Sequence, residues 1–584
     1  MKNFLDSARL IPPVTAETER RRDLFQISWR SMQMAERRQS ERYAVSFPIR
    51  IKWKDDDGNV ITEEGLTENV GLNGTLVFLP RRLPSVGSRV NSFGIGGEME
   101  IRTGVHTQKQ LISSPRVHFG LGEATATDVL RIIWNNGFVQ AEFDLQADQV
   151  IAAEQRLKGS CPHLFTWNGE RFVMVKDAPP WSPALGLKIN AQDIAGVMET
   201  EEWFKIPGET VKPKDGAYEF RITGEYWESF YIDHYKLMVI DHPEGTEIFA
   251  DERFAVPPPP LKVHTTGAAR PFAKVFDHNG NDVSETVRAI DEVYLDGIKR
   301  GKFQGVAEDH WAEFVLPADA PTDKELMLVA DGWLHPTDAS INVQLGQSSF
   351  TPPKSLSLEV PDGDGWRVVR ENLGFPAGKM KTVLVELPPG ERRFRLRTNM
   401  EIYWDRLVWA EIKDGDENRT TTIELGSAEL RYRGFSVIEK ANASSPEKPI
   451  YDQILTTGQR WRDLEGYYTR FGDVRELLTG VDGRMVLMNA GDELILRFPA
   501  LPDPPAGYKR DLVFVGNGWI KDGDLNSVFS KTLLPLPRHD SNDYTIPPTR
   551  LEDDPVYKRH MSDWLNFHTR YVAPDNFRDR VRRP

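Results

Sequence analysis

Apolar and polar residues alternate along most of the chain from Tyr43 onward. Residues 43–53 alternate, the run Asp55–Asn59 is typical of a hairpin turn, and residues 60–67 alternate again. Short apolar runs separated by turn-forming residues continue to about residue 540, and we expect Phe119, Ile132 and Trp134 to be core residues. The pattern predicts a mostly β protein.

The chain has 584 residues, too many for one hydrophobic core, so several domains are expected. The pattern of residues 18–34 favours one helix. This segment is either a charged surface helix or disordered arm, or else a helix that relays ligand binding. Shifts in composition and the Pro257–Pro260 run suggest seven segments. These are a lead-in arm (1–36), a first domain (37–88), a second (89–157), β-rich or sandwich-like domains (158–256, 261–415 and 416–540), and a polar tail (541–584).

Composition narrows the class of protein. Hydrophobic content of 39% and charged content of 27% are ordinary for a globular chain, and the net charge of −14 argues against nucleic-acid binding. Residues 1–52 hold eleven Lys and Arg against six Asp and Glu, so an anion site is expected near this end. Cys161 is the single cysteine, which excludes an internal disulfide. We see no signal peptide and no membrane span, so a cytoplasmic protein is expected, with an extracellular or periplasmic one as the alternative.

Two short motifs carry most of the chemical information. Arginines cluster in the segment RRQSER, at Arg37, Arg38 and Arg42, just ahead of the first predicted strand. A glycine-rich turn follows, with the sequence NVGLNG from Asn69 to Gly74. Guanidinium groups pair bidentately with phosphate and with the Hoogsteen edge of guanine, and they stack on flat rings. The pair of motifs predicts a site for an anionic, purine-bearing ligand.

These motifs resemble those of the PilZ domain, the bacterial receptor module for cyclic di-GMP, with the signature RxxxR followed by (D/N)xSxxG. Arg38 and Arg42 match the first part, and Asn69 and Gly74 match the second. The resemblance implies a β-barrel, which is either truncated near Ser85 or completed by strands of the next domain.

The resemblance also implies roles for single residues. Arg38 and Arg42 would hold phosphate and the Hoogsteen edge of guanine, and Arg37 would add charge or stacking. Asn69 would bond the base, and Gly74 would let the backbone approach. Gly71 stands where the signature has serine. The missing hydroxyl costs on the order of 1 kcal/mol, a several-fold loss of affinity.

A second resemblance covers roughly residues 85–155. The strings GVHTQKQ, VHFGLG and VLRIIWNNG follow one another from Gly104 to Gly137. Together they resemble the ASPIC/UnbV module, for which the family implies a β-rich extracellular or matrix-type domain without established catalytic activity. The region from Cys161 onward resembles the tail that commonly follows this module in bacterial proteins.

Other candidates favour plain structural roles. Three acidic loops, beginning at Asp277, Asp362 and Asp522, resemble calcium-binding loops, but none has EF-hand spacing, and hairpin turns are the favoured interpretation. Cys161 is expected to be a buried small hydrophobe. We expect no metal, no cofactor and no catalytic residue. Trp366, Tyr403 and Trp404 are candidates for stacking on sugars, although aromatic residues in strands are more often core.

The sequence therefore leads to two hypotheses. The first is a non-enzymatic receptor that binds cyclic di-GMP through a PilZ-like module. The second is an extracellular adhesion or carbohydrate-binding protein of the ASPIC/UnbV type, with a degenerate PilZ-like segment and a glycan or protein partner bound by its C-terminal β domains.

Overall fold

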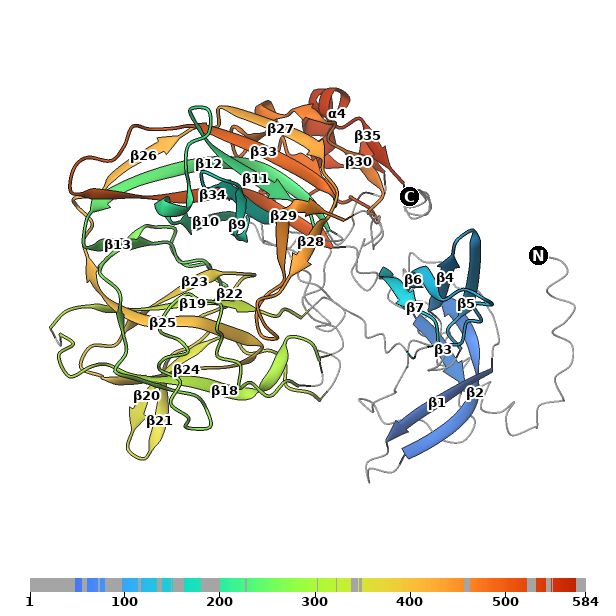
Figure 1. Cartoon of the computed structure of the whole chain (residues 1–584), viewed down its shortest axis with the longest axis horizontal. Coiled ribbons are helices and arrows are strands. Elements are labelled where there is room, and N and C mark those ends of the chain that lie inside the picture. Colours follow the sequence, from blue (N-terminus) through green and yellow to red (C-terminus); the bar gives the residue numbers. More distant parts are fainter. Residues whose placement is uncertain are drawn as a thin grey trace, which may run out of the picture. The chain divides into compact units, whose positions relative to one another are not determined.

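The structure is a computed structural model that divides into two compact units, residues 1–95 and 96–584. Each unit is described by itself (Figure 1). The residues that the structure describes are 48–54, 60–71, 74–78, 97–113, 117–133, 139–148, 150, 162–179, 200–225, 228–301, 303–321, 323–337, 345, 349–455, 463–522, 532–541, 548 and 550–573.

The first unit contains an open antiparallel sheet of three strands. The strands follow in the order β1 (Pro48–Lys54), β2 (Val60–Gly71) and β3 (Gly74–Phe78). Lys54 pairs with Val60, as expected for strands joined by the predicted hairpin turn. The strands described in this unit form no closed barrel, so the expected PilZ-like barrel is not seen. The lead-in arm and its predicted helix lie outside the described residues.

The second unit begins with a four-stranded antiparallel sheet of order β5-β4-β6-β7. Its strands are β4 (Glu98–Thr103), β5 (His106–Leu111), β6 (Ala126–Ile133) and β7 (Val139–Gln146). Ile101, Leu130 and Ile132 form its core, and Phe119 packs against them. The predicted core positions Phe119 and Ile132 are confirmed, whereas Trp134 lies outside the described residues.

The next part of the chain folds into a β-sandwich. Its first sheet has the order β31-β27-β33-β11-β8-β9, and its second has the order β10-β34-β12-β26 with β32 paired to β12. The strands are β8 (His163–Trp167), β9 (Phe172–Asp177), β10 (Glu201–Ile206), β11 (Ala217–Thr223), β12 (Glu228–Pro243), β26 (Arg419–Ile423), β27 (Ser427–Tyr432), β31 (Gly472–Asp473), β32 (Val486–Met488), β33 (Asp492–Pro499) and β34 (Tyr508–Asp522).

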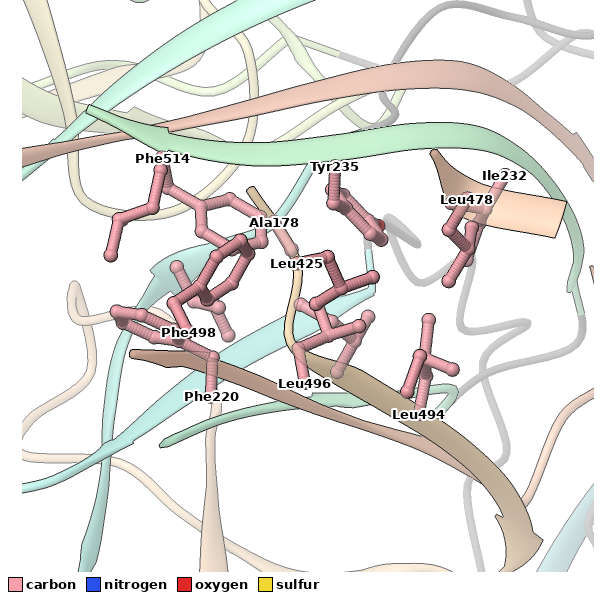
Figure 2. Packing of buried hydrophobic residues seen from close by; sticks show 14 of the residues in the cluster. Ala178, Phe220, Ile232, Tyr235, Leu425, Leu478, Leu494, Leu496, Phe498 and Phe514 are labelled. Carbon is pink, nitrogen blue, oxygen red and sulfur yellow. The ribbon is translucent and has the colours of Figure 1, made fainter. Parts of the chain in front are cut away.

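The core of this first sandwich follows from the two-residue period of its strands. In β11, Tyr218, Phe220 and Ile222 face inward, while Glu219 and Arg221 alternate with them. Figure 2 shows side chains of the first sheet meeting those of the second sheet; the labelled ones include Phe220, Leu494, Leu496 and Phe498 from the first and Ile232, Tyr235 and Phe514 from the second. The apolar faces of two sheets therefore bury each other, as in other β-sandwiches.

A second sandwich has the same plan. One sheet holds β13 (Thr246–Phe249), β15 (His264–Gly267), β16 (Arg270–Pro271), β19 (Leu326–Leu334), β23 (Lys381–Leu387) and β25 (Ile402–Lys413). The other sheet has the order β17 (Lys274–Phe276), β18 (Val306–Val315), β24 (Arg393–Met400), β20 (Ser357–Asp362) and β21 (Gly365–Arg370). Its core joins Phe314 and Phe394 of one sheet to Leu328 and Trp409 of the other.

The second sandwich is inserted into the first. The chain leaves the first sandwich after β12 and returns at β26, and these two strands pair with each other, Leu237 opposite Ile423. Figure 1 shows green β12 beside red β34, which pair over most of their length. The segments 158–256 and 416–540, expected as separate domains, thus contribute strands to the same two sheets. Local alternation indicates which residues form strands, but it does not indicate which distant strand each one pairs with.

Short elements complete the unit. They are the strand pairs β14 (Arg253–Phe254) with β22 (Phe375–Pro376), β28 (Ser436–Glu439) with β29 (Lys448–Ile454), and β30 (Gly466–Tyr468) with β35 (Arg570–Val572), the 3-10 turns η3 (Gly208–Thr210), η4 (Arg475–Leu478) and η5 (Leu551–Asp553), and the helices α3 (Pro555–Arg559) and α4 (Met561–Phe567).

The segment expected as a polar tail is partly folded. Val556, Trp564 and Val572 pack in a cluster with Tyr231 and Trp519 of the first sandwich. Val556, Trp564 and Val572 are therefore core residues, although the segment is polar on average. No helix in the described part of the chain has the length and hydropathy that a membrane crossing requires.

Two buried carboxylates join the sandwiches. Asp177 Oδ1 lies 2.9 Å from Nδ1 of His163, and its Oδ2 accepts the backbone N–H of Lys379 at 2.8 Å. The carboxylate of Glu252 accepts a hydrogen bond from Lys176 Nζ at 2.6 Å and another from the backbone N–H of Thr382 at 3.0 Å. His163 and Lys176 belong to the first sandwich, whereas Lys379 lies two residues before β23 of the second sandwich and Thr382 lies on β23.

The junction also buries positive charge. Lys381 is fully buried, and its Nζ donates to the backbone carbonyl of Asp177 at 2.6 Å and lies 3.2 Å from the ring centroid of Phe204. Burial raises the pKa of Asp177, but Lys379, His163 and Lys381 together outweigh it and lower that pKa to about 2. Ionised Asp177 is therefore stabilised by the folded state.

We expect Asp177→Asn to lower the free energy of unfolding at neutral pH by about 3–5 kcal/mol, because it leaves buried cations without their carboxylate. The pKa of Asp177 is depressed from 3.8 to about 2 in the fold. Its stabilising contribution is therefore complete above pH 3.8 and is lost as the pH falls towards 2. Urea unfolding of both proteins at several pH values measures this.

The difference in stability between wild type and variant should narrow by about 2 kcal/mol across that acidic window. Asp416→Asn, at an exposed aspartate, serves as the control and should leave the profile unchanged. A difference that stays constant down to pH 2 would contradict the assignment.

Candidate functional site

The nucleotide site predicted from sequence is only partly covered by the structure. Arg37, Arg38 and Arg42 lie outside the described residues. The second motif forms the end of the β2–β3 hairpin, where Gly71 pairs with Gly74. Asn69 pairs with Leu76, directly after a β-bulge in β2. The hairpin thus brings Asn69, Gly71 and Gly74 close in space, and nothing in the structure tests their relation to the arginines.

The acidic loops behave as turns in the described residues. The carboxylate of Asp277 accepts the backbone N–H groups of Asn279 at 2.9 Å and Asn281 at 2.8 Å, closing its own loop. Burial raises the pKa of Asp277, but hydrogen bonds from these two asparagines outweigh it and lower that pKa. Asp362 and Gly365 pair at the β20–β21 turn. No three His, Cys, Asp or Glu side chains gather into a metal site in this part of the chain. Cys161 and residues 523–531 lie outside it.

Two of the three proposed sugar-stacking residues are buried. Tyr403 and Trp404 are neighbours on β25, and their side chains belong to two different buried clusters. Their rings are therefore not available to a ligand, because both faces of β25 are packed. Trp366, on the edge strand β21, is half-buried and remains at the surface.

Trp366 lies on the outer face of the sheet β17-β18-β24-β20-β21. Alternation decides which residues share that face. In β24, Phe394 and Leu396 point into the core, so Arg393, Arg395 and Arg397 point outward. In β18, Ala312 and Phe314 are core residues, so Trp311 and Glu313 point outward. The register pairs Trp311 with Arg397 and Glu313 with Arg395.

The aromatic and guanidinium groups on this face stack in alternation. The Cζ atom of Arg395 lies 4.4 Å from the ring centroid of Trp311 and 3.9 Å from that of Trp366. Arg397 lies 5.4 Å from Trp311, and Arg393 lies 5.3 Å from Trp366. These distances are typical of cation–π contacts. We call these five side chains, Arg397, Trp311, Arg395, Trp366 and Arg393, the Trp–Arg column.

Carboxylates bind the guanidinium groups of the column, and two of these carboxylates are buried. Glu313 accepts Nε of Arg393 at 2.6 Å and Nε of Arg395 at 3.0 Å, and Glu359 accepts Arg397 at 3.3 Å. The side chains of Glu313 and Glu359 are only 6% and 4% exposed, whereas those of Arg393 and Arg397 are 54% and 39% exposed. Asp309, which accepts Nε of Arg397 at 2.9 Å, is the exposed acid of the group. The three guanidinium groups are thus matched by three carboxylates, two of which are buried beneath them.

Arg395 is the most firmly held guanidinium on this face, and its side chain is 19% exposed. Two indole rings and the buried carboxylate of Glu313 fix its guanidinium. Its two terminal nitrogens have no hydrogen-bond acceptor among the residues that the structure describes. A fixed guanidinium with both terminal nitrogens unused is arranged to bind a carboxylate bidentately. The alternation RFRLR over residues 393–397, which places three arginines on one face of a strand, is the sequence signal for this site.

The four-stranded sheet explains the strings that carry the ASPIC/UnbV resemblance. On β5, Gln108 Nε2 donates to the carbonyl of Gly120 at 2.6 Å, and Gln110 Nε2 donates to that of His118 at 2.7 Å. Between these bonds, Phe119 packs on the core. The glutamines of GVHTQKQ thus hold the backbone of VHFGLG against the sheet, which is a structural role.

Comparison with known proteins agrees with the second resemblance. Residues 86–158 match the family model described as ASPIC and UnbV, close to the expected 89–157. No PilZ family model matches the chain. No curated protein and no solved structure matches it. The chain therefore contains an ASPIC/UnbV domain, followed by two β-sandwiches, one inserted into the other.

Proposed function

We propose that the chain is a non-enzymatic binding protein whose second sandwich holds an acidic polysaccharide on the Trp–Arg column. The observation that carries this proposal is Arg395, with its guanidinium fixed between two indoles and on Glu313 while its terminal nitrogens have no acceptor among the described residues. A uronate carboxylate would accept both terminal N–H groups. The flanking arginines would add attraction for neighbouring acidic sugars along the chain.

A polymer suits this face better than a compact ligand. The column takes its residues from β18, β24 and β21, which span four neighbouring strands of the sheet, and the guanidinium groups at its two ends are well exposed. The sandwich supplies a rigid support, since the residues alternating with the column are core residues. Sugar rings bound to Arg395 would meet the edges of the indoles of Trp311 and Trp366, because the guanidinium groups of the column stack over the ring faces.

This function belongs outside the cytoplasm, where acidic polysaccharides of cell walls and matrices occur, and it fits the matrix-type setting implied by the ASPIC/UnbV resemblance. Fractionating cells and probing for the protein separates this proposal from a cytoplasmic receptor.

We expect Arg395→Ala to weaken binding of an oligogalacturonate to the intact chain about 10- to 100-fold, because a charge-assisted bidentate pair is lost. Arg395→Lys should give an intermediate loss, since it keeps the charge but cannot form the fork. Binding should also weaken with added salt. Isothermal titration calorimetry measures these affinities.

Two controls sharpen this test. Arg270→Ala removes another guanidinium stacked on a tryptophan of the same sandwich, 4.9 Å from the ring of Trp409, and should leave binding unchanged. A fully methyl-esterified oligogalacturonate keeps the sugar rings without their charge and should bind weakly to wild type. Equal binding of the esterified and acidic sugars, or full affinity in Arg395→Ala, would refute the proposed site.

Cyclic di-GMP binding at the N-terminal motifs is the second candidate function. It is supported by the sequence motifs and by the β2–β3 hairpin, which pairs Gly71 with Gly74 and places Asn69 two residues away on the same strand. In this interpretation Arg38 and Arg42 hold phosphate and guanine, and Arg37 adds charge or stacking. Asn69 bonds the base, and binding orders the arginine segment and repositions it against the neighbouring domain.

The intact chain should then bind cyclic di-GMP in calorimetry, and the double variant Arg38→Ala/Arg42→Ala should lose that binding. Gly71→Ser should raise the affinity several-fold, because it restores one hydrogen bond worth on the order of 1 kcal/mol. Absence of binding at high micromolar ligand would dismiss this candidate. Normal binding by the double variant would show that the nucleotide sits elsewhere.

A further inference from the structure

We propose that the β30–β35 ribbon carries a second carbohydrate site, which stacks the apolar face of a neutral sugar ring on Tyr467 and Tyr571. This site is separate from the Trp–Arg column and does not depend on the function proposed for it.

Strand pairing places the two tyrosines side by side. Tyr467 lies directly opposite Tyr571 in the register of the ribbon, and their ring centroids are 4.9 Å apart at an interplanar angle of 62°. Tyr467 is 43% exposed and Tyr571 is 49% exposed. The rings meet edge to face, so each keeps part of its own surface open to solvent.

The base under this pair is rigid. Tyr468, the next residue of β30, is fully buried. Its hydroxyl oxygen lies 2.6 Å from Ser229 Oγ and donates a hydrogen bond to the carbonyl of Leu464 at 3.0 Å. On β35, Val572 is buried in the same cluster. Period-two alternation therefore fixes Tyr467 and Tyr571 on the opposite, outer side. Two exposed aromatic rings on a well-packed ribbon indicate a contact surface.

The polar groups around the pair indicate which ligand fits. The hydroxyl of Tyr571 donates to the carboxylate of Glu465, which adds a hydrogen-bond acceptor beside the rings. The neighbouring guanidinium of Arg570 is already bound, since it pairs with buried Asp492 and donates Nε to the carbonyl of Thr469 at 3.1 Å. Among the residues that the structure describes, the carboxylate of Glu465 therefore lies beside Tyr571, and the guanidinium of Arg570 is engaged by Asp492.

A neutral sugar matches this arrangement. The C–H face of a pyranose is apolar and stacks on aromatic rings, while its hydroxyls donate hydrogen bonds to a carboxylate. An acidic sugar would be repelled by Glu465, which separates this ligand class from that of the column.

The test uses the intact chain with neutral hexasaccharides of glucose, xylose and mannose at millimolar concentration. We expect at least one of them to bind. Tyr467→Ala and Tyr571→Ala should each weaken that binding about three- to tenfold, and the double variant should abolish it. Tyr571→Phe keeps the ring and should retain most of the affinity. Thermal unfolding should be nearly unchanged in all of these variants, because the side chains are exposed.

Tyr432→Ala is the matched control, since Tyr432 is an equally exposed tyrosine on β27. This variant and Arg395→Ala should bind the neutral sugar as wild type does. The proposal is overturned if no neutral hexasaccharide binds, or if the double tyrosine variant binds as well as the control. It is equally overturned if Arg395→Ala, and not the tyrosine variants, loses the neutral sugar.

Discussion

The buried ionic contacts of Asp177 and Glu252 hold the two sandwiches together. A buried carboxylate is costly to desolvate unless charges and hydrogen bonds compensate it fully. Both carboxylates meet that condition, Asp177 with His163 and the Lys379 segment, and Glu252 with Lys176 and Thr382. Since each carboxylate takes partners from both sandwiches, neither would be satisfied in one sandwich alone. The two sandwiches therefore form a single structural unit.

The junction leaves other faces open for binding. It contacts the second sandwich through β23, which belongs to the sheet opposite the one that carries the Trp–Arg column. The tyrosine pair lies on a short ribbon packed against the first sandwich by Tyr468 and Val572. Both candidate sites have a rigid, buried support and exposed side chains above it. This arrangement supports the proposal that both surfaces bind extended ligands.

Local patterns predicted much of the fold and little of its assembly. Alternation identified the strands and the core residues Phe119 and Ile132, because period-two burial is a local property. Pairing of β12 with β26 and β34 could not be read from it, since those partners are distant in sequence. Tyr403 and Trp404 were candidate ligand residues but are core residues, whereas Arg395 went unnoticed because its role depends on indoles from two other strands.

The most direct test of the account is a crystal structure of the intact chain with bound oligogalacturonate. The account predicts a uronate carboxylate paired with both terminal nitrogens of Arg395, its sugar ring against Trp311 or Trp366, and Glu313 still bound to Nε of Arg395. An oligosaccharide bound elsewhere on the chain, with Arg395 uncontacted, would contradict it.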